Sequence, residues 1–240
     1  MDIIISGYGR MGKEVEKVCR KLKHRIIAIV DNESDWQKLP IINASTTVVI
    51  DFSMPNVAIN NYLRCFNLGI AVVTGTTGWY EKFDKVSEQC NIHNGTLFYA
   101  TNFSIGVNLF FKANTYLAQL MSGFNNYDIH INETHHIHKV DAPSGTAITT
   151  AEGIIAENKK LDSWELNKND SDNSLPIFSI REGEITGRHE VVYESDEDKI
   201  ILKHEAKNRS GFALGAVLAA EFVVGKKGVY NMDNLLNQVL

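Results

Sequence analysis

A glycine-rich turn between an apolar strand and a helix constrains this chain more than any other feature. The run Gly7-Tyr8-Gly9-Arg10-Met11-Gly12 directly follows a strand predicted at residues 3–6 and opens a segment with helical periodicity. In that context the G-x-G-x-x-G spacing permits a tight turn, lets the backbone approach a pyrophosphate, and allows the helix to pack closely on the strand. A nucleotide-binding βαβ unit is therefore expected at the front of the chain.

A carboxylate occurs where such a unit would need one. A second apolar strand is predicted at residues 26–31, and Asp31 follows the glycine motif by the roughly 20 residues that separate these features in dinucleotide-binding proteins. A carboxylate there can accept hydrogen bonds from the adenine ribose. Glycines that merely form a turn are the alternative, which the strand, the helix and Asp31 disfavour when taken together.

The first half of the chain alternates short apolar runs with helical segments. Further strands are predicted at residues 48–52, 71–74 and 96–99, and helices at 11–22, 57–66 and 80–89. This alternation is typical of βαβ units with helices on both faces of a parallel sheet. The expected fold class is α/β, with a Rossmann-like dinucleotide-binding domain first.

Beyond about Gly106 the pattern changes to a helix followed by longer strands, which predicts a second, α+β domain. The strands are predicted at residues 127–133, 177–181, 189–194 and 200–206, with a solvated polar loop at 157–176. An apolar helix predicted at 215–224 could return to the first domain. The expected domains are 1–105 plus 215–240, and 106–214.

Two loops are expected to overhang one crevice at the carboxyl edge of the sheet. They are Gly75-Thr76-Thr77-Gly78, after the fourth strand, and Ala100-Thr101-Asn102-Phe103-Ser104, after the fifth. Their small and hydroxyl residues would let a flat nicotinamide ring lie close to the backbone. Ordinary turns, with Asn102 capping a helix, explain either loop equally well when it is taken alone.

Residues 133–147 concentrate basic side chains in a chain whose net charge is -5. Because the whole molecule offers no general positive field, any anion site must be built locally. Metal binding by the histidines is disfavoured, since no cysteine or carboxylate lies at ligand spacing and only His136 and His138 would share a strand face. For His138 alone, a solvated strand end is preferred. No metal is expected.

The anion site has a second half farther along the same segment. Pro143-Ser144-Gly145-Thr146 precedes a helical run at residues 147–158, so the amides near Gly145 and Thr146 can hold a carboxylate at a helix N-terminus. Lys139 adds a full positive charge. Together these groups predict a small ligand with more than one carboxylate.

Composition excludes several other classes of function. The acidic balance disfavours nucleic acid as a partner. The cysteines Cys19, Cys65 and Cys90 form no C-x-x-C pair and suit a reducing cytosol. No apolar stretch approaches the roughly 18 residues that span a bilayer, and no secretory signal is recognisable. A cytoplasmic protein without a membrane partner is expected.

The basic segment, E-T-H-H-I-H-K-V-D-A-P-S-G-T-A, resembles the signature of the dihydrodipicolinate reductase family. G-T-T-G-W, A-T-N-F-S-I-G-V-N and R-E-G-E-I-T-G-R-H-E match other blocks of the family in the same order, from Ile3 to the C-terminal helix. The resemblance implies NAD(P)H-dependent reduction of a cyclic dicarboxylate, 4-hydroxy-tetrahydrodipicolinate, to tetrahydrodipicolinate in lysine and diaminopimelate biosynthesis. It also implies a homotetramer, assembled through a second domain that binds substrate and mediates oligomerisation.

The resemblance also assigns residues to roles. The cofactor-binding positions would be Gly7, Tyr8, Gly9, Arg10, Met11, Gly12, Asp31, Gly75, Thr76, Thr77, Ala100, Thr101, Asn102 and Phe103. The substrate-binding positions would be His136, Lys139, Gly145 and Thr146. His135 matches the acid/base residue proposed for the family and Lys139 the proton donor, and either would deliver the proton that balances the hydride.

The sequence after the second strand favours NADH over NADPH. The Asp31 carboxylate would accept from a ribose diol but repel a 2′-phosphate, and Asn32 and Glu33 add no cation. Arg10 and Lys13 are the reservation, because either side chain could reach a phosphate, although a solvated helix face is the preferred interpretation for both.

Two rival functions stay open. One is another two-domain dehydrogenase, acting on an amino-acid aldehyde or a sugar, which the H-H-x-H-K segment with P-S-G-T disfavours. The other is a dinucleotide-sensing regulator without turnover. Such a regulator should lack proton-transfer residues, whereas His135 and Lys139 are both present.

Overall fold

The computed structural model describes residues 1–168 and 170–238 of the chain. These residues form two compact units. The first combines residues 1–104 with 209–240, and the second consists of residues 105–208. The second unit is therefore a continuous segment inserted between two parts of the first.

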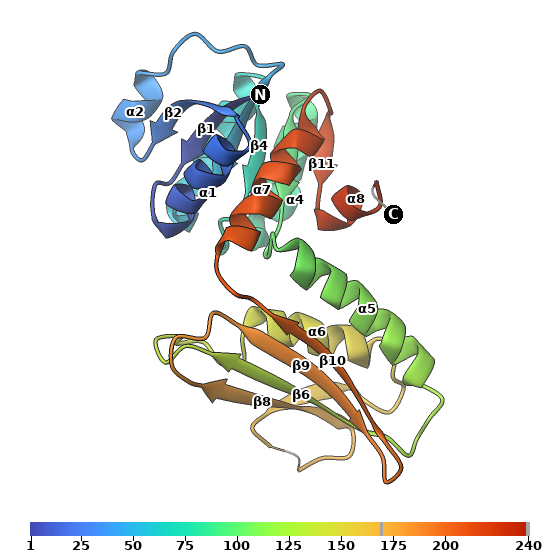
Figure 1. Ribbon diagram of the computed structural model, residues 1–240. Helices are drawn as coiled ribbons and strands as arrows, with labels where there is room; N and C mark the ends of the chain where they lie inside the picture. The colour runs from blue at the N-terminus through green and yellow to red at the C-terminus, as the bar shows by residue number, and fades with distance from the viewer. Residues whose placement is uncertain (169, 239–240) are drawn as a thin grey trace. The chain divides into compact units, whose positions relative to one another are not determined.

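The sheet of the first unit is parallel, with the strand order β11-β5-β4-β3-β1-β2, and Figure 1 labels β1, β2, β4 and β11. Its strands are β1 (Asp2–Ser6), β2 (Arg25–Val30), β3 (Thr47–Asp51), β4 (Ala71–Thr74), β5 (Thr96–Tyr99) and β11 (Gly228–Tyr230). The chain passes from β1 to β2 on one side and then to β3 on the other. In open parallel sheets, ligands bind outside the carboxyl ends of the strands at such a reversal.

Helices cover both faces of this sheet. They are α1 (Arg10–Lys21), α2 (Glu33–Gln37), α3 (Pro55–Asn67), α4 (Phe83–Ile92), α7 (Ser210–Val223) and α8 (Met232–Leu236), with a 3₁₀ turn, η1 (Tyr80–Lys82). α1 packs against α7, and α3 packs against α4. Ile4, Val49 and Val72 face α3 and α4 in one buried core cluster. Because side chains alternate along a strand, Ile3 and Ile5 occupy the opposite face and are also fully buried.

The second unit packs two helices, α5 (Ile105–Met121) and α6 (Gly145–Ile155), against a mixed sheet. The strands are β6 (Asp128–His135), β7 (Ser163–Leu166), β8 (Ser174–Arg181), β9 (Arg188–Glu194) and β10 (Lys199–Glu205), in the order β10-β9-β6-β8-β7. β9 runs antiparallel to β6 and β10, whereas β8 runs parallel to β6 and β7. The predicted fold class is confirmed in both units. Among the described helices, none combines the length and apolar character that a membrane span requires.

The polar segment at residues 157–176 corrects the prediction of a loop. It contains β7 and the start of β8, while Asn169 lies outside the described residues. β7 is an edge strand whose side chains are exposed or only partly buried, which fits the lack of an apolar run in its sequence. Trp164 is half-buried and packs against the core of the second unit, which anchors this edge.

Candidate active site

The turn between β1 and α1 requires glycine at two positions. Gly7 has a φ of +83°, and a Cβ placed there would lie 2.5 Å from the carbonyl oxygen of Phe52. A Cβ on Gly12 would overlap the carbonyl oxygen of Gly7. Gly9 differs, because no protein atom lies within 4 Å of a Cβ built on it. α1 begins without a side-chain cap, so its first amides can serve an anion.

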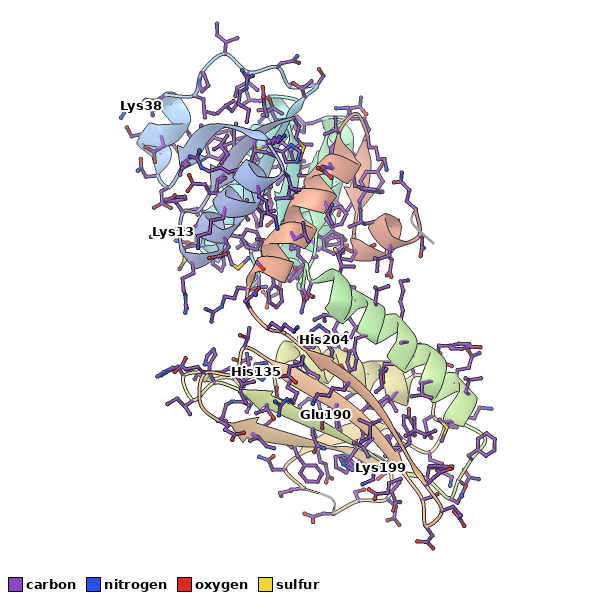
Figure 2. The ribbon with its side chains drawn as sticks, viewed as in Figure 1. Lys13, Lys38, His135, Glu190, Lys199 and His204 are labelled. Carbon is purple, nitrogen blue, oxygen red and sulfur yellow. The ribbon has the colours of Figure 1, made fainter. Side chains whose placement is uncertain are left out.

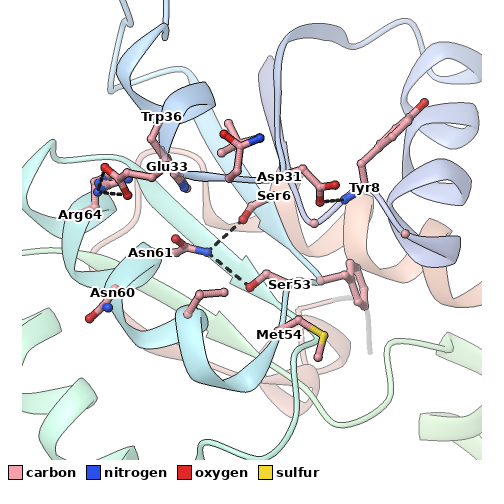
Figure 3. Close-up of a pocket in the computed structure, with 16 residues that line it drawn as sticks. Ser6, Tyr8, Asp31, Glu33, Trp36, Ser53, Met54, Asn60, Asn61 and Arg64 are labelled. Atoms are coloured by element: carbon pink, nitrogen blue, oxygen red, sulfur yellow. Dashed lines mark hydrogen bonds and ion pairs between the residues drawn. The ribbon is translucent and has the colours of Figure 1, made fainter.

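A cavity of about 410 Å³ opens at the carboxyl ends of the central strands (Figure 3). It lies at the strand reversal identified above, with walls from the ends of β1, β2 and β3 and from α3. Its lining includes Ser6, Gly7, Tyr8, Gly9, Val30, Asp31, Asn32, Glu33, Trp36, Phe52, Ser53, Met54, Val57, Asn60, Asn61 and Arg64. The structure therefore brings the first part of the glycine motif and Asp31 to one cavity.

Two carboxylates organise this edge of the sheet. Asp31 is exposed, and it accepts a hydrogen bond from the Tyr8 amide at 2.9 Å. Asp51 is fully buried, and its carboxylate accepts from the Ser6 hydroxyl at 2.6 Å and the Thr76 hydroxyl at 2.7 Å. The Asn61 amide donates to both Ser6 and Asp51 at 3.2 Å, and Figure 3 shows the bond to Ser6. Asp51 thus ties together the ends of β1 and β3, α3 and the loop after β4.

Arg64, on α3, also lines the cavity and was not predicted from the sequence. One terminal nitrogen of Arg64, on α3, donates to both carboxylate oxygens of Glu33 at 2.7 and 2.9 Å. The guanidinium carbon lies 5.1 Å from the ring centroid of Trp36. Arg10 and Lys13, the cations weighed from the sequence, are exposed and do not line the cavity.

Of the other predicted cofactor residues, Arg10, Met11 and Gly12 lie in the first turn of α1, and residues 75–77 and 100–103 follow β4 and β5. None of them lines this cavity. Phe103 is buried and packs against Phe52 and Phe98, with ring centroids 5.9 Å apart in each pair. The Asn102 side chain accepts a hydrogen bond from the Ser104 amide at 2.9 Å, and Ala100 is buried. Gly75 adjoins the Phe52 ring, whereas Thr77 and Thr101 are exposed.

In the second unit, a buried carboxylate at the end of β6 organises the predicted catalytic segment. Glu133 is fully buried, and its Oε2 lies 2.8 Å from Nδ1 of His135. Its Oε1 accepts from the Ser144 amide at 3.1 Å, the Ser179 hydroxyl at 2.6 Å and the Arg181 guanidinium at 3.0 Å. Burial alone would raise the pKa of Glu133, but these hydrogen bonds outweigh it and lower the pKa. Glu133 is therefore ionised at neutral pH.

Two imidazoles adjoin this carboxylate (Figure 2 labels His135). His135 is 7% exposed, and its ring centroid lies 5.1 Å from that of His189. Burial, reinforced by the neighbouring His135, lowers the pKa of His189 to about 3. Nε2 of His189 lies 3.1 Å from the Ser144 hydroxyl. Gly187 adjoins both rings, because a Cβ built on it would lie 3.1 Å from Nε2 of His135 and 3.8 Å from Cε1 of His189.

The prediction that His136 and His138 share a strand face is wrong. β6 ends at His135, so His136 and His138 lie in the following turn and share no strand face. His138 is 68% exposed and lies 3.1 Å from Glu184. The described residues that could offer converging ligand atoms are instead Glu133, His135 and His189. Oε2 of Glu133 and Nδ1 of His135 lie 2.8 Å apart, although neither atom has a hydrogen bond of regular geometry among the described residues.

The predicted anion-binding groups lie in the loop after β6 and at the start of α6. Nζ of Lys139 is 2.7 and 2.8 Å from the Asp141 carboxylate oxygens. Burial would raise the pKa of Asp141, but the hydrogen bond and charge of Lys139 lower it. Ser144 caps α6 by accepting from the Ala147 amide at 3.2 Å. Gly145 is exposed and Thr146 is half-buried in the first turn.

Two family models cover nearly all of the chain. The model described as dihydrodipicolinate reductase, N-terminus, matches residues 1–103, and the model described as dihydrodipicolinate reductase, C-terminus, matches residues 106–236. The chain belongs to the dihydrodipicolinate reductase family. It is therefore an oxidoreductase, in a family that depends on pyridine nucleotides.

Relatives of the dihydrodipicolinate reductase family match over the full length. The 4-hydroxy-tetrahydrodipicolinate reductase of Christiangramia forsetii is 43% identical, covering 100% of this chain and 99% of the relative. That of Staphylococcus aureus strain MRSA252 is 33% identical, covering 98% and 100%. The dipicolinate-bound dihydrodipicolinate reductase of Paenisporosarcina sp. TG-14 shares the fold, with a TM-score of 0.75 at 23% identity over 98% of both chains.

Proposed function

We propose that this chain reduces 4-hydroxy-tetrahydrodipicolinate to tetrahydrodipicolinate with NAD(P)H, in the biosynthesis of lysine and diaminopimelate. One observation carries the proposal. The buried Glu133 carboxylate connects His135 to the capped start of α6, next to the loop that bears Lys139. This arrangement combines proton-transfer groups with an anion seat, which a reductase of a cyclic dicarboxylate needs.

The first unit is proposed to hold the cofactor. Its glycine turn, the uncapped start of α1 and Asp31 fit a pyrophosphate and a ribose diol. A reduced nicotinamide dinucleotide supplies a hydride when bound. The proposed binding residues are those predicted from the sequence in residues 7–12, 75–77 and 100–103, with Asp31. We infer a preference for NADH, because Asp31 would repel a 2′-phosphate.

The second unit is proposed to hold the substrate. His136, Lys139, Gly145 and Thr146 would bind its carboxylates, and Lys139 or His135 would deliver the proton that balances the hydride as water leaves. Contact with Glu133 at Nδ1 would fix the orientation and tautomer of His135, leaving Nε2 for exchange. The Lys139 ammonium donates two hydrogen bonds to Asp141, which would leave its third N–H for the substrate.

The reaction is tested with substrate generated in place by enzymatic condensation of pyruvate with aspartate semialdehyde. NADH oxidation should require both precursors and the purified chain. Aspartate semialdehyde alone with NADH, and a sugar with NAD⁺, serve as controls for the rival dehydrogenases. NADH oxidation by aspartate semialdehyde alone, NAD⁺ reduction by the sugar, or no NADH oxidation with the condensed product would contradict the proposal.

We further propose a cytoplasmic homotetramer assembled through the sheet of the second unit. Apolar side chains exposed on its strands support such an interface, with Ile180 46% and Ile201 53% exposed. Light scattering coupled to size exclusion should give four times the chain mass of 26.9 kDa. Glutamate substitution of Ile201 should shift the mass toward smaller species.

A further inference from the structure

The cavity of the first unit is lined by more negative than positive side chains. Among its described lining residues, Arg64 supplies one positive charge, and Asp31 and Glu33 supply two negative ones, which sums to 1 − 2 = −1. NADPH differs from NADH by a 2′-phosphate on the adenine ribose. Asp31 is proposed to bind the diol of this ribose. The position of the single cation therefore bears directly on cofactor choice.

Two neighbours hold the half-buried Arg64 side chain in place. Glu33 pairs with one terminal nitrogen, and the buried Trp36 ring supports the plane of the guanidinium. The other terminal nitrogen, Nη1, is buried and has no hydrogen-bond partner among the described residues. Arg64 therefore retains an unused donor beside a ligand-sized cavity.

We propose that Glu33 determines cofactor specificity by withholding Arg64 from a 2′-phosphate. This inference rests on the proposed nucleotide-binding role of the first unit. While the pair is intact, the guanidinium is neutralised, and the exposed Glu33 carboxylate adds a second repulsion to that of Asp31. Once Glu33 is neutral, the planar guanidinium is free to donate to phosphate oxygens.

Glu33 contributes little to the stability of the fold around it. The side chain of Glu33 is 64% exposed, and ion pairs of such exposed groups contribute little to folding. α2 is capped by Asn32 and Asp35, which form a complete capping box without Glu33. Substituting Glu33 should therefore leave the fold intact and change the electrostatics of the cavity.

The test compares the affinities of the full chain for adenosine 2′,5′-bisphosphate and for 5′-AMP. Because these ligands differ only by the 2′-phosphate, the ratio of the two affinities reports the effect of that phosphate. Calorimetry at fixed ionic strength would compare wild type, Glu33→Gln, Arg64→Met and the double variant. Glu88→Gln, an exposed glutamate on α4 outside the cavity, is the matched control. Thermal melts check folding.

Glu33→Gln should improve the bisphosphate affinity relative to 5′-AMP by roughly tenfold, the factor given by about one net charge-assisted hydrogen bond. The gain should disappear in the double variant and shrink at high salt. Arg64→Met alone should change the ratio by less than about twofold, because the wild-type guanidinium is already neutralised.

An unchanged ratio in Glu33→Gln would overturn the inference, as would a gain that persists without Arg64. These measurements need no turnover, so the failure of the proposed reduction would be seen separately in the NADH assay. A wild-type chain that binds neither nucleotide would overturn the cofactor role of the first unit, and with it this inference.

Discussion

The Glu133 carboxylate joins residues that are distant in the sequence. It contacts His135 at the end of β6, Ser144 before α6 and Arg181 at the end of β8. Removing one partner of a buried ion pair typically costs about 3–5 kcal/mol, because a charge is left uncompensated. The loop that carries Lys139 is bound to the same network, since Arg181 also donates to the Asp141 carbonyl at 2.7 Å.

Lys139→Ala should lower kcat by about a hundredfold or more, the usual cost of losing a general acid. Nucleotide affinity should be nearly unchanged, because the predicted cofactor residues lie in the first unit. Steady-state kinetics and NADH fluorescence titration measure the two effects. Lys199→Ala is the matched control, since Lys199 also pairs with a carboxylate, Glu194 at 2.7 Å, in the second unit. A rise confined to KM would indicate binding alone.

Asp31 should favour NADH over NADPH in the wild-type chain. Wild type should show a higher kcat/KM with NADH than with NADPH, and Asp31→Ala should narrow the difference by removing both the diol acceptor and a repulsive charge. Asn32→Arg should narrow it further by adding a cation. Parallel kinetics with both cofactors at one ionic strength are decisive, and a wild-type preference for NADPH would contradict the inference.

Single residues were predictable where a motif fixes their local context. Gly7, Gly9 and Asp31 meet in one cavity because strand ends of a parallel sheet share an edge. The Arg64–Glu33 pair could not be predicted, since its members are 31 positions apart and only the packing of α3 brings them together. His189, on β9, reaches Ser144 across 45 positions for the same kind of reason.

At the scale of the element, a substitution at Gly145 can test the N-terminus of α6 as a carboxylate site. Among the described residues, nothing lies within 4 Å of a Cβ built on Gly145, so a side chain there fits the fold and would obstruct the carboxylate that we propose to bind at this helix N-terminus. Gly145→Val should weaken dipicolinate binding by roughly tenfold or more, since a hydrogen bond to a charged group contributes about 1.5–3 kcal/mol. NADH affinity should not change.

Gly123→Val is the matched control, because Gly123 is exposed in the turn after α5 and has equally open surroundings. Calorimetric titration of wild type and both variants with dipicolinate and with NADH gives the comparison. Equal losses of both ligands would indicate unfolding, and unaltered dipicolinate affinity would remove the α6 amides from the substrate site.

Long periodic elements could be predicted, while short ones could not. The helices α1, α3 and α4 and the strands β1 to β5 lie within a few residues of their predicted places. α2, β11 and α8 span only a few residues and carry too little periodicity to be recognised. β11 pairs Gly228 with Thr96, and that partner supplies the order that its own sequence lacks.

For the molecule as a whole, acid should weaken the fold through buried histidine. The folded pKa of His189 is lowered to about 3 from 6.5, so its stabilising contribution is complete above pH 6.5 and falls as the pH drops toward 3. Each pH unit in that window costs up to about 1.4 kcal/mol. Glu133, whose pKa is lowered from 4.5, adds a further loss below that pH.

Urea unfolding followed by circular dichroism between pH 7 and pH 5 would measure this slope. His189→Gln should flatten the slope relative to wild type, whereas His138→Gln should not, because His138 is exposed. Identical slopes in wild type and His189→Gln would show that His189 is not held neutral by the fold.

The first unit is built from two segments of the chain that flank the second unit, so the ribosome makes its two parts at different times. The ribosome completes residues 105–208 before it makes α7 and β11, which belong to the first unit. Until then, the β5 edge that pairs with β11 lacks its neighbour, and the sheet face covered by α7 lacks a helix. The inserted unit can therefore fold on the nascent chain before the sheet of the first unit has all of its strands and helices. Ribosome-bound chains stalled before Ser210 should consequently expose apolar surface that chaperones recognise.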